Sequence, residues 1–320
     1  MKAMIKLTIL DGFAANPGDL SWEPFKKFAE LTIYDRTPPE LTVERIADSD
    51  AIFLNKVAIT EEILKDCPKL KYIGVLATGY NVVDLEAAKK RGIIVTNIPS
   101  YSTDSVAQHV FSLILNFTNQ VEQHSISVQN GDWINSKDFC YWLSPLTELK
   151  GKTLGIFGFG SIGQKVAKIA HAFDMNVLIN VHSKKSFTGN EKSVSVDELF
   201  AQSDFLTLHA PMTAETKEIV NEKTLSLMKK TAFIINTARG GLVNESDIKK
   251  ALDEQKIAGY ASDVLLKEPM TKDCPLFKAK NCVLTPHIAW APREARQRLF
   301  NIALENLEAF ISGKPINVVN

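Results

Sequence analysis

The stretch Thr153-Leu-Gly-Ile-Phe-Gly-Phe-Gly-Ser-Ile-Gly163 decides the fold: an apolar strand leads through three spaced glycines into a helix. In such a frame Gly158 permits a tight turn, Gly160 lets the backbone approach a pyrophosphate, and Gly163 lets the helix pack closely on its strand. The first N–H groups of the helix have no intrahelical partners and therefore attract an anion. We predict a dinucleotide site that includes Gly158, Phe159, Gly160, Ser161, Ile162 and Gly163.

The residues after this turn continue the pattern of a βαβ unit. Residues 161–173 place apolar side chains at helical spacing, and another apolar run follows. The alternation then continues and gives six strand candidates at residues 154–157, 177–180, 205–208, 232–236, 259–262 and 282–285. Strands that alternate with helices in this way predict a doubly wound parallel sheet.

The first hundred residues carry a second alternation. Strand candidates lie at residues 5–10, 31–34, 51–54, 72–76 and 93–96, and helical candidates lie at 22–30, 41–47, 61–66 and 83–91. A last helix starts near Pro292, ends at Gly313 and is expected to return to this domain. We predict a discontinuous domain of residues 1–100 plus 291–320, and a dinucleotide-binding domain of residues 101–290.

Composition excludes several classes of function. The chain has 37 Lys plus Arg and 37 Asp plus Glu, so it lacks the basic surplus of a nucleic-acid-binding protein. No apolar run reaches the roughly 18 residues of a membrane span, and the start is too short for a secretory signal. We expect a cytosolic protein with no nucleic-acid or membrane partner. The four cysteines lack metal-ligand spacing, so no metal is expected.

An aromatic, poorly periodic segment covers residues 130–148 and carries Trp133, Phe139, Tyr141 and Trp142. Exposing so many large apolar groups to water is unfavourable. The segment therefore either packs on its own domain or forms a subunit interface, and the pattern leaves both open.

Three strand ends carry polar residues suited to hydride transfer onto a 2-oxo acid. Arg239, with Thr237 and Ala238 before it, follows residues 232–236; Glu268 and His287 follow the next two strands. Because ligands bind beyond the carboxyl ends of parallel strands, these side chains are expected to converge. His287 would deliver a proton to the carbonyl oxygen, Glu268 would favour and orient the charged imidazole, and Arg239 would bind a carboxylate. Taken singly, each has an ordinary structural alternative, such as a turn cap or a surface ion pair.

The sequence resembles the D-isomer-specific 2-hydroxyacid dehydrogenases over essentially its whole length, most closely their glycerate dehydrogenase or hydroxypyruvate reductase branch. The motifs that carry the resemblance are Leu76-Ala-Thr-Gly-Tyr-Asn81, Gly158-Phe-Gly-Ser-Ile-Gly163, Leu208-His-Ala-Pro-Met-Thr213, Asn236-Thr-Ala-Arg-Gly-Gly241, the segment 263–269 and Thr285-Pro-His-Ile-Ala-Trp290. The resemblance implies an α/β fold of two Rossmann-like domains, the discontinuous one flavodoxin-like, that close over the substrate.

The resemblance also implies roles for individual residues. Arg239, Glu268 and His287 take the places of the family's catalytic arginine, glutamate and histidine. Thr78 and Gly79 fall in the loop whose backbone holds the substrate carboxylate. The expected cofactor contacts are Asp263 at the nicotinamide and His209 and Pro211 near the adenine side. The family's usual assembly is a dimer joined through the nucleotide domains, which favours the interface interpretation of residues 130–148.

One position departs from the pattern of the NAD-dependent members. They end their second strand with an aspartate that binds the ribose 2′-OH, and here Val181 stands at that position. Valine accepts no hydrogen bond and does not repel a 2′-phosphate, which His182, Ser183 and Lys184 are placed to contact. We predict that NADP(H) is favoured and that NAD(H) is possible.

Two classes of function remain open. The first is a reductase of hydroxypyruvate or glyoxylate, which forms D-glycerate or glycolate. The second is a dinucleotide-sensing binding protein or co-repressor on the same scaffold, because a fold does not fix a function. Among enzymes, a dehydrogenase for another 2-hydroxy acid is a further alternative.

Overall fold

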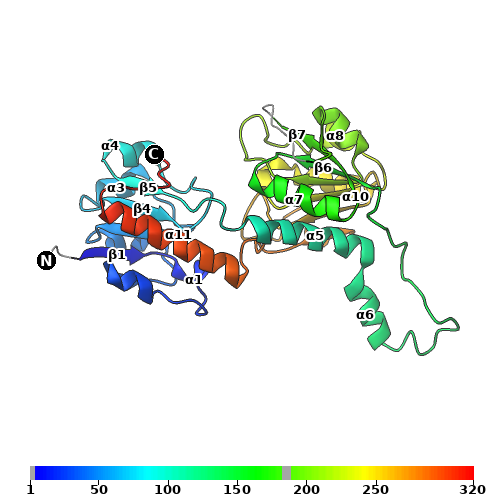
Figure 1. The fold of residues 1–320 in the computed structure, drawn as a ribbon, viewed down its shortest axis with the longest axis horizontal. Coiled ribbons are helices and arrows are strands. Elements are labelled where there is room, and N and C mark those ends of the chain that lie inside the picture. Colours follow the sequence, from blue (N-terminus) through cyan, green and yellow to red (C-terminus); the bar gives the residue numbers. More distant parts are fainter. Residues whose placement is uncertain (1–3, 182–188) are drawn as a thin grey trace. The chain divides into compact units, whose positions relative to one another are not determined.

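The computed structural model describes residues 4–181 and 189–320. The chain divides into two compact units, the first formed by Met1–Ser102 with Trp290–Asn320 and the second by Thr103–Ala289. Each unit contains its own parallel sheet covered by helices (Figure 1). The predicted fold class, two parallel-sheet α/β domains, is confirmed.

The first unit holds a five-stranded sheet in the order β2-β1-β3-β4-β5. All its neighbouring strands run parallel. This order is that of the flavodoxin-like folds. The strands are β1 (Ile5–Ile9), β2 (Ala29–Ile33), β3 (Ala51–Leu54), β4 (Tyr72–Val75) and β5 (Ile94–Thr96). Short helices connect them: α1 (Gly12–Ala15), α2 (Thr42–Ile46), α3 (Glu61–Lys65) and α4 (Leu85–Lys90).

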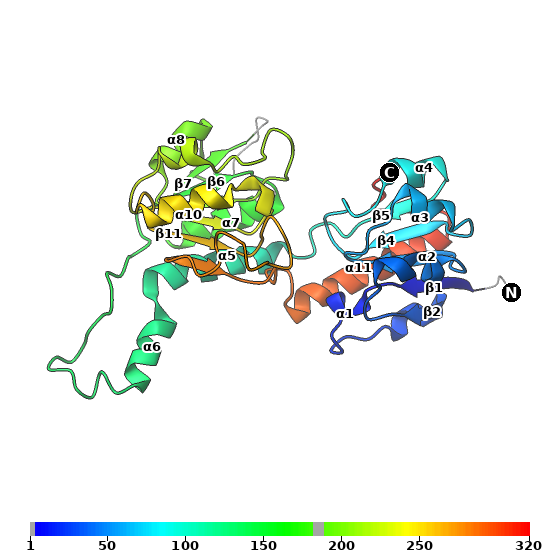
Figure 2. The ribbon, with the colours of Figure 1, turned by 180° about the vertical axis from the view of Figure 1, so that it is seen from behind.

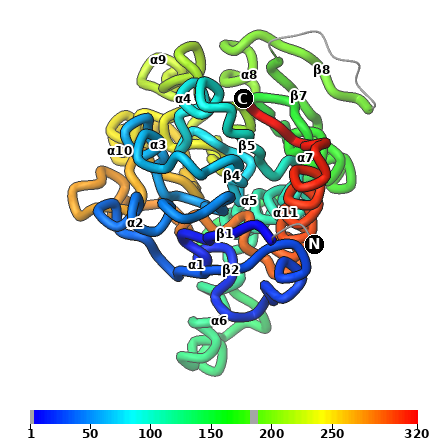
Figure 3. The backbone as a smooth tube through the Cα atoms, turned by 90° about the vertical axis from the view of Figure 1, so that its left-hand side faces the viewer, coloured from blue at the N-terminus to red at the C-terminus, as the bar shows by residue number. Residues whose placement is uncertain are grey.

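Helix α11 (Arg293–Ile311) covers one face of this sheet, opposite α2 and α3 (Figure 3). Its buried stripe, which includes Leu299, Phe300 and Leu307, packs with Phe53 and Tyr72 of the strands. This apolar contact joins the end of the chain to its beginning. An antiparallel bridge between Thr96 and Val318 extends the connection.

The second unit holds a seven-stranded sheet in the order β12-β11-β10-β9-β6-β7-β8. The strands are β6 (Thr153–Phe157), β7 (Asn176–Asn180), β8 (Lys192–Ser193), β9 (Phe205–Leu208), β10 (Phe233–Asn236), β11 (Gly259–Ser262) and β12 (Cys282–Leu284). From β6 the chain first builds the sheet outward on one side through β7 and β8. It then returns to β9 on the other side, so the switch point where doubly wound sheets bind ligands lies between β6 and β9.

Helices cover both faces of this second sheet (Figures 1 and 2). The buried sides of α5 (Thr103–Asn119) and α7 (Ser161–Ala172) form one core, and those of α8 (Val196–Gln202) and α10 (Glu245–Asp253) form the other. Ser195 and Glu198 form a capping box, and Asn244 caps α10.

Some local predictions were wrong. The segment predicted as a helix over residues 22–30 contains only a 3-10 turn, Glu23–Lys27, and Ala29 already starts β2. Helix α6 (Val121–Gln129) and strand β8 were not predicted, because α6 is weakly amphipathic and β8 spans two residues. Within the described part of the chain, no helix has the length and apolar character needed to cross a membrane.

Candidate active site

The glycine turn after β6 has the geometry expected for phosphate binding. Gly158 has φ +91°, and a Cβ there would lie 2.6 Å from the Ala210 backbone nitrogen. A Cβ on Gly163 would lie 2.4 Å from the Gly158 oxygen, so both positions need glycine for close packing. Gly160 differs, because a Cβ there would meet no atom of the described residues within 4 Å. As the N-cap of α7, Gly160 leaves open space at the helix end that attracts anions.

Two buried polar atoms beside the sheet edge have no hydrogen-bond partner among the residues that the structure describes. They are His209 Nε2, after β9, and Thr237 Oγ1, after β10. Burial lowers the pKa of His209 to about 3, so its imidazole is neutral near pH 7. Native proteins rarely leave such atoms unpaired. Together with the space at Gly160, they fit a dinucleotide that supplies polar groups along this edge.

Arg239 lies in the loop after β10, and Asn236, the last residue of that strand, holds this loop in place. The fully buried Asn236 amide donates to the Arg239 oxygen at 2.9 Å and accepts from the Ala238 nitrogen at 3.0 Å. Gly240 then lets this loop pass against the backbone of Leu265, where a Cβ would come within 2.0 Å. The exposed guanidinium donates from Nη1 to the Ala238 oxygen at 2.7 Å. The Arg239 loop thus packs directly on the loop that leads to Glu268.

Glu268 and His287 form a hydrogen-bonded pair. Glu268 Oε2 lies 2.7 Å from His287 Nδ1, and both side chains are about one-third exposed. The other carboxylate oxygen of Glu268 accepts from the Leu265 nitrogen at 2.9 Å. Because a carboxylate only accepts, His287 Nδ1 carries the hydrogen and Nε2 is the ring nitrogen that can exchange a proton with a ligand.

Asp263 organises the loop that carries His287. The carboxylate is 1% exposed. Its Oδ1 accepts from Thr285 Oγ1 at 2.6 Å and from the Ile288 nitrogen at 2.8 Å, and Oδ2 accepts from the Ala289 nitrogen at 2.8 Å. Sequence reasoning missed this function and did not single out Thr285, although an acidic residue directly after a buried strand was a usable signal. The nicotinamide contact expected of Asp263 stays a prediction.

Thr78 and Gly79 lie in the first unit, in the loop after β4. Thr78 Oγ1 donates to the Ile98 oxygen at 2.9 Å, and Asn97 donates to the Thr78 oxygen at 2.8 Å. These bonds fix the loop at the carboxyl end of the sheet, where parallel sheets bind ligands. The role of this loop in holding a substrate carboxylate stays a prediction.

The remaining predicted cofactor residues differ in position. Ser161 and Pro211 are exposed, Ile162 and Ala238 are half-buried, and Phe159 is buried in the core. Phe159 therefore contributes its backbone to the turn and packs its ring inside. Ser183 and Lys184 lie outside the described residues.

The chain is similar in sequence to known proteins of one family of dehydrogenases. The family model for the NAD binding domain of D-isomer specific 2-hydroxyacid dehydrogenases matches residues 111–289. The chain is 45% identical to a hydroxypyruvate reductase of Blautia hydrogenotrophica, over 99% of this chain and 100% of the relative.

Solved structures resemble the whole chain. An acyclic imino acid reductase in complex with NADPH and D-Arg has a TM-score of 0.87 and 33% identity, covering 99% of this chain and 100% of that one. An NADPH-dependent glyoxylate/hydroxypyruvate reductase of Sinorhizobium meliloti, in complex with NADP and malonate, has a TM-score of 0.84 and 26% identity, covering 99% and 97%.

Proposed function

The chain belongs to the D-isomer specific 2-hydroxyacid dehydrogenase family, and we propose that its substrates within that family are hydroxypyruvate and glyoxylate. The enzyme is an oxidoreductase that transfers a hydride between a nicotinamide dinucleotide and a small 2-oxo acid. The products proposed are D-glycerate and glycolate. The observation that carries the proposal is the 2.7 Å His287–Glu268 pair at the same sheet edge as Arg239 and the glycine turn.

The geometry supports a division of roles among three side chains. The nicotinamide, when bound, supplies the hydride that adds to the carbonyl carbon. His287 Nε2 gives its proton to the carbonyl oxygen, on which negative charge develops. Glu268 stabilises the imidazolium and holds its orientation, and the Arg239 fork pairs with the substrate carboxylate. Glu268 keeps its hydrogen bond to Nδ1 while the proton leaves from Nε2.

The same pair argues against a binding protein or co-repressor. A protein that only senses a dinucleotide needs no partly exposed imidazole held by a carboxylate. Initial rates of NADPH oxidation with hydroxypyruvate, glyoxylate and pyruvate, each repeated with NADH, test the proposal. Turnover of the first two is expected. No turnover with any pair would remove the enzyme assignment and favour the binding protein.

We infer a preference for NADPH over NADH from Val181. This residue directly follows β7, and its half-buried side chain packs against the core shared by α5 and α7. It offers no carboxylate to a ribose 2′-OH and no charge to repel a 2′-phosphate. His182, Ser183 and Lys184, which would contact that phosphate, lie outside the described residues.

Replacing Val181 tests this inference. Val181→Asp should shift the kcat/KM ratio toward NADH by about tenfold or more, the effect of one charge-assisted hydrogen bond of about 1.5 to 3 kcal/mol. Val181→Asn accepts a hydrogen bond without a charge, so comparing the two separates hydrogen bonding from repulsion. A wild-type enzyme that already prefers NADH would refute the inference.

We also propose a homodimer formed through residues 121–146, here called the arm. The arm consists of α6 and the irregular segment after it, and it stands out from the rest of its unit (Figure 1). Several large apolar side chains on it are exposed, among them Ile134 at 87%, Phe139 at 89% and Trp142 at 65%. Packing on its own unit, one of the two alternatives, therefore does not occur for these side chains.

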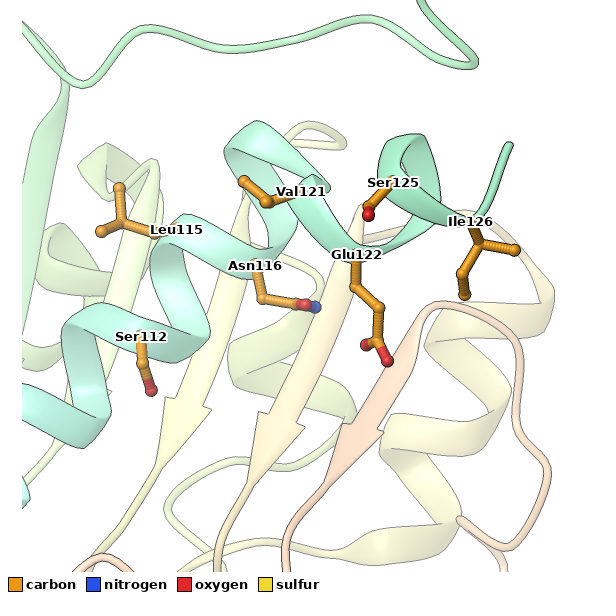
Figure 4. A pocket seen from close by; sticks show the side chains of 7 residues that line it. All are labelled: Ser112, Leu115, Asn116, Val121, Glu122, Ser125 and Ile126. Atoms are coloured by element: carbon orange, nitrogen blue, oxygen red, sulfur yellow. The ribbon is translucent and has the colours of Figure 1, made fainter. Parts of the chain in front are cut away.

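Hydrogen bonds hold the arm in a defined conformation although its apolar side chains are exposed. The irregular segment folds back along α6: the Leu143 nitrogen donates to His124 Nε2 at 3.1 Å, and Ser144 Oγ donates to Gln120 Oε1 at 2.6 Å. A hollow of about 480 Å³ lies beside α5 and α6, lined by Ser112, Leu115, Asn116, Val121, Glu122, Ser125 and Ile126 (Figure 4). An ordered apolar projection beside a partly apolar hollow on the same unit suits a symmetric contact between two copies.

The cytosolic location expected from the sequence also belongs to this proposal. Its basis is the small-molecule chemistry proposed for the site. Fractionation of cells that express the untagged chain tests it, with enzyme activity expected in the cytosolic fraction.

A further inference from the structure

A series of hydrogen bonds links helix α5 to the loop that carries His287. Its first member is His109 of α5, whose Nε2 lies 3.0 Å from Thr285 Oγ1 and 3.6 Å from Asp263 Oδ1. The Thr285 hydroxyl in turn lies 2.6 Å from Asp263 Oδ1. None of the sequence motifs includes His109, and its side chain is only 17% exposed.

The direction of each hydrogen bond in this series follows from the Asp263 carboxylate at its end. A carboxylate only accepts, so the Thr285 hydroxyl must donate its single proton to Asp263. The Thr285 oxygen can then only accept from His109, which places a hydrogen on His109 Nε2. His109 is therefore a donor toward the loop. It stands on a helix fixed by the buried side chains of Val110, Phe111 and Ile114.

The loop held in this way contains a backbone conformation that needs support. His287 has φ +56°, in the left-handed region that costs a non-glycine residue about 1–2 kcal/mol. Asp263 binds the loop on both sides of it, through the Thr285 hydroxyl before and the Ile288 and Ala289 nitrogens after. The Asp263 carboxylate thus holds the backbone on both sides of His287, whose ring hydrogen-bonds Glu268.

We propose that His109 is a positioning residue for the reaction, which holds His287 against Glu268 through Thr285 and Asp263. This inference rests on the proposed role of His287 as proton donor. His109 touches neither residue of the reacting pair in the contacts described. Its effect should therefore appear in the rate of the chemical step and not in cofactor binding.

Two substitutions separate a hydrogen-bonding role from simple packing. His109→Gln places an amide nitrogen near the position of Nε2 and keeps the donor, whereas His109→Leu fills a similar volume without one. With hydroxypyruvate, His109→Leu should lower kcat about tenfold or more, because small misplacements of catalytic groups are costly. His109→Gln should remain within about threefold of wild type, and the KM for NADPH should stay within about twofold in both.

A control substitution and substitutions at a second position distinguish the proposed role from a general loss of stability. Gln108→Leu makes a comparable change at the exposed neighbouring position of α5 and should leave kcat unchanged. Thr285→Val removes the middle hydroxyl and Thr285→Ser keeps it, so only the valine variant should lose activity. If the chain of bonds acts as one unit, the His109→Leu and Thr285→Val double variant should be no slower than the worse single variant.

Nuclear magnetic resonance of ring-¹⁵N-labelled histidines supplies a readout that does not depend on turnover. The chain has six histidines, so His287 can be assigned by substitution. The Nδ1 proton of His287, hydrogen-bonded to Glu268, should be observed in wild type and His109→Gln and should shift or broaden in His109→Leu. A wild type inactive on every 2-oxo acid would defeat the proposed function, and this spectrum would still decide the inference.

Two results would overturn the inference. One is an unchanged kcat and an unchanged His287 signal in His109→Leu. The other is an equal loss in the glutamine and leucine variants, which would assign His109 a packing role. If His109→Leu does not fold, the Thr285 valine and serine pair gives the same comparison.

Discussion

At the scale of single residues, the proposed reaction depends on the imidazole of His287, whose Nδ1 lies 2.7 Å from Glu268 Oε2. Replacing His287 with alanine should lower kcat by about 10²- to 10⁴-fold, the usual contribution of a positioned acid or base. Dissociation constants for NADPH, measured by fluorescence titration, should change little because the phosphate turn is intact. Full activity in this variant would remove the proposed mechanism.

His209 makes the stability of the unliganded protein depend on pH. Its folded pKa of about 3 lies below the unfolded value near 6.5, so the unfolded chain binds more protons as the pH falls. The stabilisation is complete above pH 6.5 and is lost progressively between about pH 6.5 and 3. From pH 7 to pH 5 the loss is about 2 kcal/mol.

Thermal or denaturant unfolding of His209→Gln checks this prediction. Glutamine does not titrate, so the variant should lose less stability than wild type between pH 7 and pH 5. Comparing the same pair of pH values in both proteins cancels the contribution of the other groups. Equal losses would show that His209 takes up a proton in the folded state.

At the scale of elements, we expect different effects from the glycines in the turn between β6 and α7: Gly158 and Gly163 should support the fold, and Gly160 should support cofactor binding. Gly158→Ala combines a positive φ with a backbone contact of 2.6 Å and should destabilise the protein by more than about 1 kcal/mol. Gly160→Ala should fold normally, because its φ is −75° and its Cβ meets open space. It should nevertheless weaken NADPH binding about tenfold or more by filling the space proposed for the pyrophosphate. Calorimetric titration and melting temperatures separate the two effects.

At the scale of the whole molecule, the arm should determine the oligomeric state. Phe139→Asp or Trp142→Asp places a charge where the dimer would bury an exposed aromatic ring, which is costly without a partner. Sedimentation should then give the mass of one 35.5 kDa chain instead of two. Lys137→Asp, an exposed polar position on the same arm, is the control and should stay dimeric. A wild-type monomer at all concentrations would rule out the homodimer.

Local patterns in the sequence determined most of the fold. The four-residue strands β3, β9 and β11 were predicted at the bounds observed, and the continuous apolar run of β3 is typical of a buried parallel strand. The glycine spacing located the turn at Gly158, since positive φ and close packing require glycine there. The predicted strands also placed Arg239, Glu268 and His287 after three parallel strands, β10, β11 and β12, whose carboxyl ends share one edge of the sheet.

Only the tertiary structure decided which side chains support those residues and which stay exposed. Thr285 and Asp263 are 22 positions apart, and His109 and Thr285 are 176 apart, so no local pattern links them. Such contacts arise when strands and helices pack, and they depend on side-chain direction as well as on register. The exposure of Phe139 and Trp142 also came only from the structure. Their apolar character predicts burial, but the fold leaves both side chains exposed. Sequence therefore determined most of the elements and the proposed reacting groups, and packing between distant segments determined how those groups are held.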